Sequence, residues 1–184
     1  MSTKIFKIDT AKSTIEWVGK KVTGAHNGTI DIADGALTLA DDKLTGGNFT
    51  IDTASIRILD VTDPATNAQF AGHLASDDFF ATEQYPTVVF EITSVRDNHV
   101  EGNLTIKGIT RPVAFDASLH LAGNTLTASG KIIVDRTKYG IKFRSGNFFK
   151  DLGDTLIYDN FVLNVQLTAA PQAFADAVIE AAGS

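Results

Sequence analysis

Hydrophobic and polar residues alternate with a period of two along most of the chain, the pattern of half-buried β-strands. In residues 99–107, HVEGNLTIK, the side chains of Val100, Leu104 and Ile106 share one face, and polar side chains occupy the other. The same alternation recurs in residues 87–93, 112–121, 126–134 and 161–167, and shorter candidates are 4–9, 13–21, 28–35, 35–43 and 46–59. The pattern therefore predicts an all-β protein.

Short turn signals separate these segments: Asp34-Gly35, Asp41-Asp42, Gly46-Gly47, Asp97-Asn98 and Gly123-Asn124. Connections this short join antiparallel neighbours, because parallel strands need long crossovers. Eight or more antiparallel strands form either a sandwich or a closed barrel, and closure removes the exposed sheet edges.

Two segments break the alternation and favour helices. In residues 76–86, SDDFFATEQYP, Ser76 is the expected N-cap, acidic residues follow it, and Pro86 returns the chain to a strand. The C-terminal segment 170–184 predicts a helical extension whose apolar stripe is formed by Phe174, Ala177, Val178 and Ala181. This stripe can pack on the rest of the protein or on a second copy of the chain, which leaves a homodimer open.

Composition favours one domain, residues 1–184, with a dry interior. The chain has 12 Phe against 3 Tyr and 1 Trp, and Phe has no polar group to bring to a wet binding face. The net charge of −6 without a basic cluster excludes a typical nucleic-acid interface. The absence of cysteine excludes disulfides and thiol chemistry.

No apolar run is long enough to span a bilayer, so we expect no integral membrane segment. The N-terminal residues MSTKIFKIDTAKSTIEW do not resemble an export signal. The expected location of the chain as it stands is cytoplasmic, with the periplasm as the alternative if a signal was removed.

The sequence contains no nucleophile elbow, no phosphate-binding glycine loop and no metal-ligand spacing, so we predict no catalytic residue and no metal. Asp77 and Asp78 do not form an acid–base pair on a helix, because adjacent helical side chains diverge by about 100°. An enzyme acting on a lipid inside a barrel would need an inward titratable group, and His73 and Asp135 are the candidates.

Three blocks resemble the signature blocks of the YceI-like family of bacterial polyisoprenoid-binding proteins. They are HLASDDFFATEQYPTVVFEI, GNLTIKGITRPVAFD and IIVDRTKYGIKF, and the opening KIDTAKSTIEWVGKKVTGAHNGTI is similar to that family's first hairpin. The likeness runs from about residue 6 to residue 168. It implies an antiparallel, eight-stranded, lipocalin-like β-barrel with a short helix between strands and an elongated apolar interior.

The same resemblance implies non-enzymatic binding, storage or transport of a long-chain lipid, namely a polyisoprenoid, an isoprenoid quinone, or a fatty acid or its amide. No cofactor beyond this lipid is expected. Many members of the family are periplasmic, and this chain departs from them in lacking the export signal and in adding the C-terminal helix.

Strand phase and neighbouring motifs select the candidate ligand-binding residues: Phe49, Ile51, Phe79, Phe90, Leu104, Ile106, Phe115 and Phe148 for the lining, with His73 and Arg136 for a polar mouth. A slip of one residue would turn every strand candidate outward. A buried Arg136 needs an acid or an anion, which is either another side chain or a ligand head group. Two alternative functions stay open: a structural or interaction barrel filled by its own Phe side chains, and an enzyme acting on an isoprenoid lipid.

Overall fold

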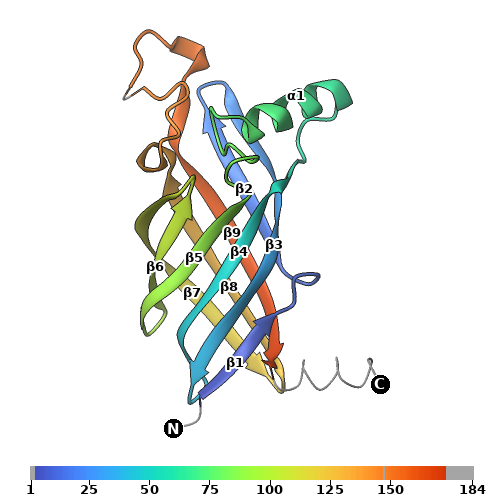
Figure 1. Ribbon diagram of the computed structural model, residues 1–184, viewed down its shortest axis with the longest axis vertical. Coiled ribbons are helices and arrows are strands. Elements are labelled where there is room, and N and C mark those ends of the chain that lie inside the picture. The colour runs from blue at the N-terminus through green and yellow to red at the C-terminus, as the bar shows by residue number, and fades with distance from the viewer. Residues whose placement is uncertain (1–2, 147, 173–184) are drawn as a thin grey trace.

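Antiparallel strands form most of the computed structural model, which describes residues 3–146 and 148–172 (Figure 1). The strands are β1 Thr3–Ile8, β2 Thr14–Lys21, β3 Gly24–Ala40, β4 Lys43–Ile58, β5 Thr87–Arg96, β6 His99–Ile106, β7 Ile109–Ala122, β8 Thr125–Asp135 and β9 Ile157–Pro171. One α-helix, α1 Pro64–Ala75, and two 3₁₀ helices, η1 Arg136–Tyr139 and η2 Gly153–Thr155, complete the described elements.

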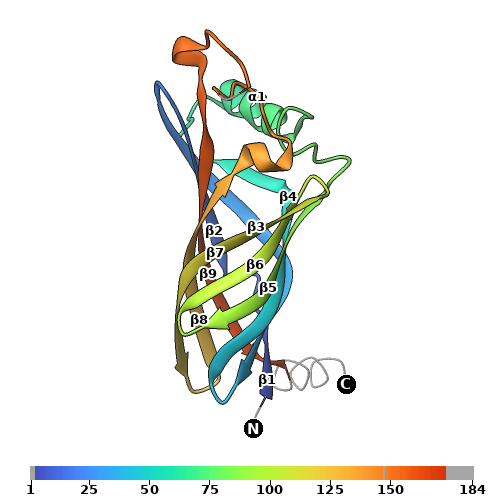
Figure 2. The ribbon, with the colours of Figure 1, turned by 90° about the vertical axis from the view of Figure 1, so that its left-hand side faces the viewer.

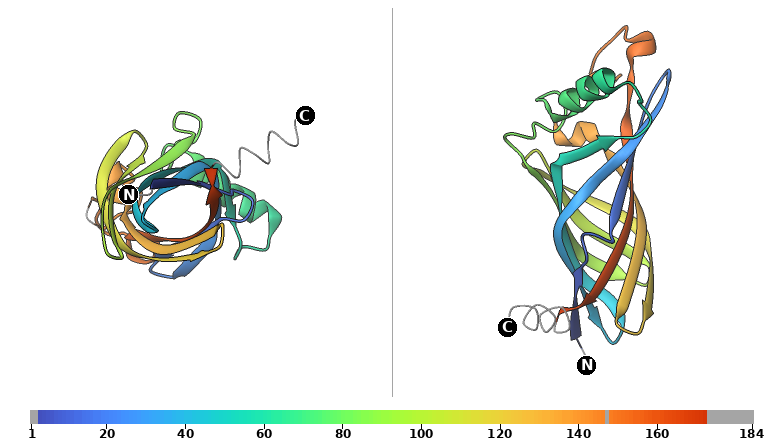
Figure 3. Two further views of the ribbon diagram at one scale, coloured as in Figure 1. Left: turned by 90° about the horizontal axis from the view of Figure 1, so that it is seen from below. Right: turned by 90° about the vertical axis from the view of Figure 1, so that its right-hand side faces the viewer.

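The sheet closes into a barrel, and the ring of strands is visible when the molecule is viewed from below (Figure 3). Both β1 and β2 pair with β3 on one side and with β9 on the other. They meet different stretches of these strands: β1 pairs with residues 36–40 of β3, and β2 with residues 24–30. Together they fill one position in the ring, so nine strands make an eight-membered barrel, and the predicted eight-stranded fold is confirmed.

Two of the predicted turns are wrong. Asp34-Gly35 and Gly46-Gly47 lie inside β3 and β4, which pair with each other along most of their length. The pairing slips its register near both places, between Ile32 and Asp34 and between Thr38 and Leu39, so these residues bend long strands instead of ending them. The turns at Asp41-Asp42, Asp97-Asn98 and Gly123-Asn124 are confirmed: Asp41, Asp42, Asp97 and Gly123 all have positive φ.

The predicted inward faces of the strands are correct. In β6 the buried positions are Val100, Gly102, Leu104 and Ile106, with Glu101 and Asn103 exposed between them. In β8 the residues Leu126, Ile132 and Val134 are almost inaccessible to solvent, and in β9 so are Leu163, Val165 and Leu167. The period-two pattern thus fixes which side of each strand faces the core.

The α-helix lies before the predicted segment, so the prediction that Ser76 begins a helix is wrong. Asp63 is the N-cap of α1, where its carboxylate accepts a hydrogen bond from the Thr66 backbone N–H at 3.0 Å, and Pro64 follows as a favourable first residue. Ser76 is the C-cap, and its backbone N–H donates to the His73 carbonyl. Residues 76–85 form successive turns, with Ala81 at a φ of 46°.

The predicted C-terminal helix of residues 170–184 lies almost wholly outside the described residues. Within the described part, β9 continues to Pro171 and pairs with β1 there. The homodimer expected from the stripe of Phe174 and Val178 therefore stays a prediction.

Gly102 makes room for the most buried aromatic side chain of the sheet. A Cβ atom at this position would lie 2.6 Å from the Phe90 ring and 2.5 Å from the Glu91 carbonyl oxygen. Phe90 in turn lies between the rings of Phe49 and Phe115, at centroid distances of 5.2 and 5.6 Å. Glycine at 102 therefore allows three aromatic rings to pack across the barrel.

We expect Gly102→Ala to lower the free energy of unfolding by about 1–3 kcal/mol, because the added methyl group forces Phe90 or the neighbouring backbone to move. Urea denaturation measures this change. Gly46→Ala in β4 is the matched control, since a Cβ there meets no atom within 4 Å. Equal stability of the two variants would contradict the packing role of Gly102.

Candidate functional site

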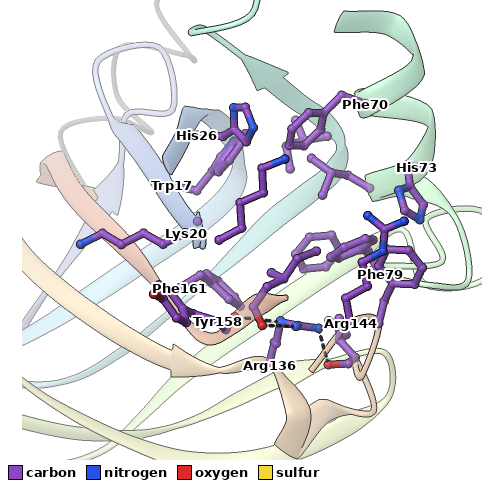
Figure 4. A pocket seen from close by; sticks show the side chains of 18 of the residues that line it. Trp17, Lys20, His26, Phe70, His73, Phe79, Arg136, Arg144, Tyr158 and Phe161 are labelled. Atoms are coloured by element: carbon purple, nitrogen blue, oxygen red, sulfur yellow. Dashed lines mark hydrogen bonds between the residues drawn. The ribbon is translucent and has the colours of Figure 1, made fainter. Parts of the chain in front are cut away.

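A cavity of about 400 Å³, here called the upper cavity, is lined by residues of α1 and of the strand ends beneath it (Figure 4). Helix α1 lies at one end of the barrel (Figure 2). The walls of the cavity come from β2, β3, β4, β9, α1, the turns after α1 and the loops around η1. The apolar lining residues are Trp17, Ile30, Ile56, Phe70, Leu74, Phe79, Phe80, Ile141, Phe143, Ile157, Phe161 and Leu163. A cavity of this size falls within the usual range for small-molecule sites, about 300–1,000 Å³.

Trp17 forms one wall because glycine stands opposite it. Trp17 and Gly28 are cross-strand partners, and a Cβ on Gly28 would lie 1.7 Å from the Arg57 carbonyl oxygen and 2.6 Å from the indole. The indole N–H donates to that same Arg57 carbonyl at 3.1 Å. The ring is therefore held in a fixed orientation, with its apolar surface toward the cavity.

Helix α1 covers the cavity and contacts the barrel through aromatic edges. The Phe70 ring lies 4.8 Å from His26 and 6.4 Å from Trp17. His73, one turn further along α1, lies edge-on to Phe79 at 5.0 Å and to Phe143 at 4.6 Å. Figure 4 shows Phe70 and His73 along the helix, with Trp17 and His26 to the left of it and Arg136 below.

Both cavity histidines are paired with a carboxylate. His26 Nδ1 lies 2.8 Å from Asp60, and His73 Nε2 lies 3.0 Å from Asp78. At Asp60 partial burial disfavours the charge, but hydrogen bonds from the Asn27 backbone N–H and from His26 outweigh it, so the pKa of Asp60 lies below its usual value. These pairs fix the two imidazoles at the edge of the cavity.

Arg136 is a buried cation in the cavity wall, only 3% exposed. Its guanidinium donates three hydrogen bonds to backbone carbonyls: Nε to Tyr158 at 3.1 Å, Nη1 to Ile141 at 2.9 Å and Nη2 to Ile157 at 3.0 Å. Burial lowers the pKa of Arg136, and the charges of Asp159 and Asp135 oppose that effect. Arginine keeps its proton even so, and the side chain ties the loop after η1 to the start of β9.

The lower part of the barrel is nearly filled by side chains. Its void measures about 40 Å³ and is lined by residues that include Phe49, Phe90 and Phe115. Between the two cavities lies a row of paired inward residues, Ile32, Ile51 and Val88, which are cross-strand partners in β3, β4 and β5. We call this row the partition. All three of its side chains are buried.

The structure distributes the predicted ligand-binding residues over different levels. Phe79, His73 and Arg136 line the upper cavity. Phe49, Phe90 and Phe115 line the lower void, Leu104 is the cross-strand partner of Phe90, Ile51 belongs to the partition, and Ile106 is buried in the core. Phe148 is 50% exposed on the loop between η1 and η2, with Lys142 Nζ at 4.6 Å from its ring centre.

Each of the two residues considered for lipid catalysis has a hydrogen-bond or ion-pair partner within the protein. Asp135 accepts hydrogen bonds from the Thr137 backbone N–H at 3.0 Å and from its hydroxyl at 2.6 Å. His73 pairs with Asp78, as described above. The part of the chain that the structure describes holds no group of acidic or histidine side chains able to bind a metal ion.

Sequence analysis did not select Trp17, Phe70, Phe143 and Phe161, although all four line the upper cavity. A signal was present for two of them. Trp17 is the only tryptophan in the chain and has the inward phase of its strand, and Phe161 has the inward phase of β9. Phe70 and Phe143 lie in α1 and in a loop, where a strand pattern carries no information.

An antiparallel barrel of eight positions with an apolar cavity under a helical cover defines a class of small-ligand-binding β-barrel. The YceI-like domain model matches residues 6–169 of the chain. The protein therefore belongs to the YceI-like family, as the sequence blocks predicted.

The relatives are bacterial proteins. A UPF0312 protein of Staphylococcus aureus strain bovine RF122 is 31% identical over 147 residues, which cover 75% of this chain and 82% of the relative. Protein YceI of Escherichia coli O17:K52:H18 is 31% identical over 148 residues, covering 76% of this chain and 72% of that protein.

Solved structures share the fold. BcnA of Burkholderia cenocepacia superposes with a TM-score of 0.71 at 24% identity, covering 89% of this chain and 99% of that one. A polyisoprenoid-binding domain from Saccharophagus degradans superposes with a TM-score of 0.68 at 13% identity, covering 90% and 98%. In the described residues of our chain, no helix combines the length and apolarity that crossing a bilayer requires.

Tyr139, the last residue of η1, carries a hydroxyl group that is buried without a hydrogen-bond partner among the described residues. Its burial raises the pKa to about 12. We expect Tyr139→Phe to stabilise the protein by about 1 kcal/mol at pH 8, because the variant no longer buries an unsatisfied hydroxyl.

The advantage of Tyr139→Phe should grow above pH 10, where the unfolded phenol ionises and the folded one does not. The wild type then loses stability as the pH rises toward 12, and the variant is spared that loss. Urea denaturation at pH 8 and pH 11 measures both effects, with Tyr158→Phe as the half-exposed control. A destabilised Tyr139→Phe variant would show that the hydroxyl group is satisfied after all.

Proposed function

We propose that the protein binds a long-chain apolar lipid in the upper cavity and carries or stores it without chemical change. The observation that carries this proposal is the cavity itself, about 400 Å³ of space walled mainly by aromatic and aliphatic side chains at one end of the barrel. A hydrocarbon tail needs only apolar walls, since its binding energy comes from leaving water.

Similarity to known proteins supports the same proposed function. The chain belongs to the YceI-like family, and one structural neighbour is described as a polyisoprenoid-binding domain. An isoprenoid or acyl tail is therefore the ligand class that we infer for this chain.

The size of the cavity limits how much tail it encloses. A methylene group needs about as much room as a water molecule in the liquid, about 30 Å³. The upper cavity, at about 400 Å³, then encloses roughly a dozen such groups. A longer polyisoprenoid leaves part of its chain at the mouth unless the partition moves.

We expect the affinity for a series of primary alcohols to rise about fourfold per added methylene, which corresponds to about 0.8 kcal/mol, and to level off near twelve carbons. Fluorescence of Trp17 reports binding directly, because this residue is the only tryptophan and lines the cavity. Native mass spectrometry of Trp17→Phe checks that the signal follows occupancy. Failure of every alcohol to bind, together with an empty organic extract of the purified protein, would overturn the proposed function.

Shortening the partition should lengthen the tails that fit. We expect Ile51→Ala to join the upper cavity to the lower void and to move the levelling-off to longer alcohols, at a cost of about 2–5 kcal/mol in stability. Ile8→Ala is the matched control, because Ile8 is also buried, in β1 beside Gly35, and lines neither cavity. A shift that both variants share would trace to lost stability and would contradict the role of the partition.

A further inference from the structure

The ionisable side chains around the upper cavity are basic, although the protein as a whole is acidic. Four of the 16 lysines and arginines line it, Lys20, Lys21, Arg136 and Arg144, together with His26 and His73. Among the described residues that line it, none is an aspartate or a glutamate, although the chain has 22 of these and a net charge of −6. A random sample of this surface would be acidic, so the basic lining calls for a physical explanation.

Of these six basic side chains, only the two histidines form ion pairs within the described part of the protein. His26 is paired with Asp60 and His73 with Asp78. Within the described residues, no carboxylate lies within 4 Å of the charged nitrogens of Lys20, Lys21, Arg136 or Arg144. Arg144 instead lies over the Phe143 ring, 4.9 Å from its centre.

Arg136 is the one buried cation among these four. Its three hydrogen bonds go to neutral carbonyls, and the charges of Asp159 and Asp135 offset part of its own charge. The nearby carboxylate of Asp135 accepts hydrogen bonds from Thr137, and Asp159 accepts one from the Ser145 hydroxyl at 2.6 Å. A buried cation whose charge is only partly offset favours an anion that enters the same space.

The basic and apolar groups occupy different depths. Lys20 and Lys21 end β2, Arg136 follows β8 and Arg144 lies in the following loop, all at the end of the barrel that carries α1. Ile30 and Leu163 line the cavity further along their strands toward the partition. An amphiphile fits this gradient in one orientation, with its tail toward the partition and its head near the cations.

We propose that the upper cavity selects amphiphiles with an anionic head group, a carboxylate or a phosphate, over neutral amphiphiles with the same tail. This inference rests on the proposed lipid-binding function and specifies its ligand class. The cations at the mouth supply the attraction, and the apolar walls supply tail binding that does not depend on the head.

The test compares four ligands with one twelve-carbon tail: dodecanoate, dodecyl phosphate, dodecanol and methyl dodecanoate. Titration followed through Trp17 should show at least one of the two anions binding about tenfold more tightly than the two neutral ligands at low salt. The difference should shrink near 1 M salt, where the screening length falls to about 3 Å. The two anionic arms distinguish a carboxylate site from a phosphate site, and a preference for either one supports the proposal.

A variant and a matched control locate the effect. The mouth variant Lys20→Gln, Lys21→Gln, Arg144→Gln should lose most of the preference for anions and keep its affinity for dodecanol. The control Lys12→Gln, Lys43→Gln, Lys131→Gln removes the same three charges from exposed positions away from the cavity lining and should keep the preference. Arg136 is left in place in both, since its substitution would also release three carbonyls.

The outcomes separate this inference from the function on which it rests. Equal affinity for charged and neutral ligands, or a mouth variant that retains the full preference, overturns the anionic selectivity and leaves lipid binding standing. If none of the four ligands binds, lipid binding itself fails.

Discussion

Closure of the sheet on eight positions is the constraint on which the rest of the structure depends. A barrel of this size has an interior just wide enough to be filled by side chains or to hold one small ligand. Whether a given level is solid or hollow is then decided by the residues that point inward there. Phe49, Phe90 and Phe115 nearly fill the lower part, and only about 40 Å³ remains.

The upper cavity exists because a helix and loops, in addition to strands, form the wall at that level. β5 and β6 lie below α1, and the space beside β2, β3 and β9 is enclosed by the helix and by the loops near η1 (Figure 2). Strands placed across a barrel interdigitate their side chains, whereas the helix laid over this opening contacts the barrel and its loops through a few side chains, among them Phe70 and His73. The molecule is thus filled by its own side chains at one end of the barrel and hollow at the other.

The period-two pattern predicted the strands and their inward faces because alternation reports burial directly. It could not place residues whose burial depends on irregular segments. Ser76 followed by two aspartates has the composition of a helix start, yet Asp63-Pro64 is the stronger start signal, and a helix that begins there ends at Ala75. The turns predicted at two glycine positions are wrong for a similar reason. Gly35 and Gly46 lie inside long strands, near places where the pairing of β3 with β4 shifts its register.

The candidate site was predictable only as far as strand phase reaches. Strand phase identified which residues face the interior of the barrel. It did not identify the level at which these residues surround empty space, because that level depends on how far each strand continues and on what covers the end. Arg136 was found through its motif, and its three carbonyl partners come from residues 5 to 22 positions away, which no local pattern connects.

Helix α1 is attached to the barrel far more weakly than the strands are attached to one another. Of its twelve residues only Leu74 is buried, and its polar anchor is the Asn67 side chain, which donates to the carbonyls of Ile58 and Val61. A segment with so little buried surface opens at a fraction of the free energy that unfolds the whole domain. Under the proposed function, exchange of a lipid at this end would not require any strand to separate, because a stable sheet is closed by a weakly attached helix.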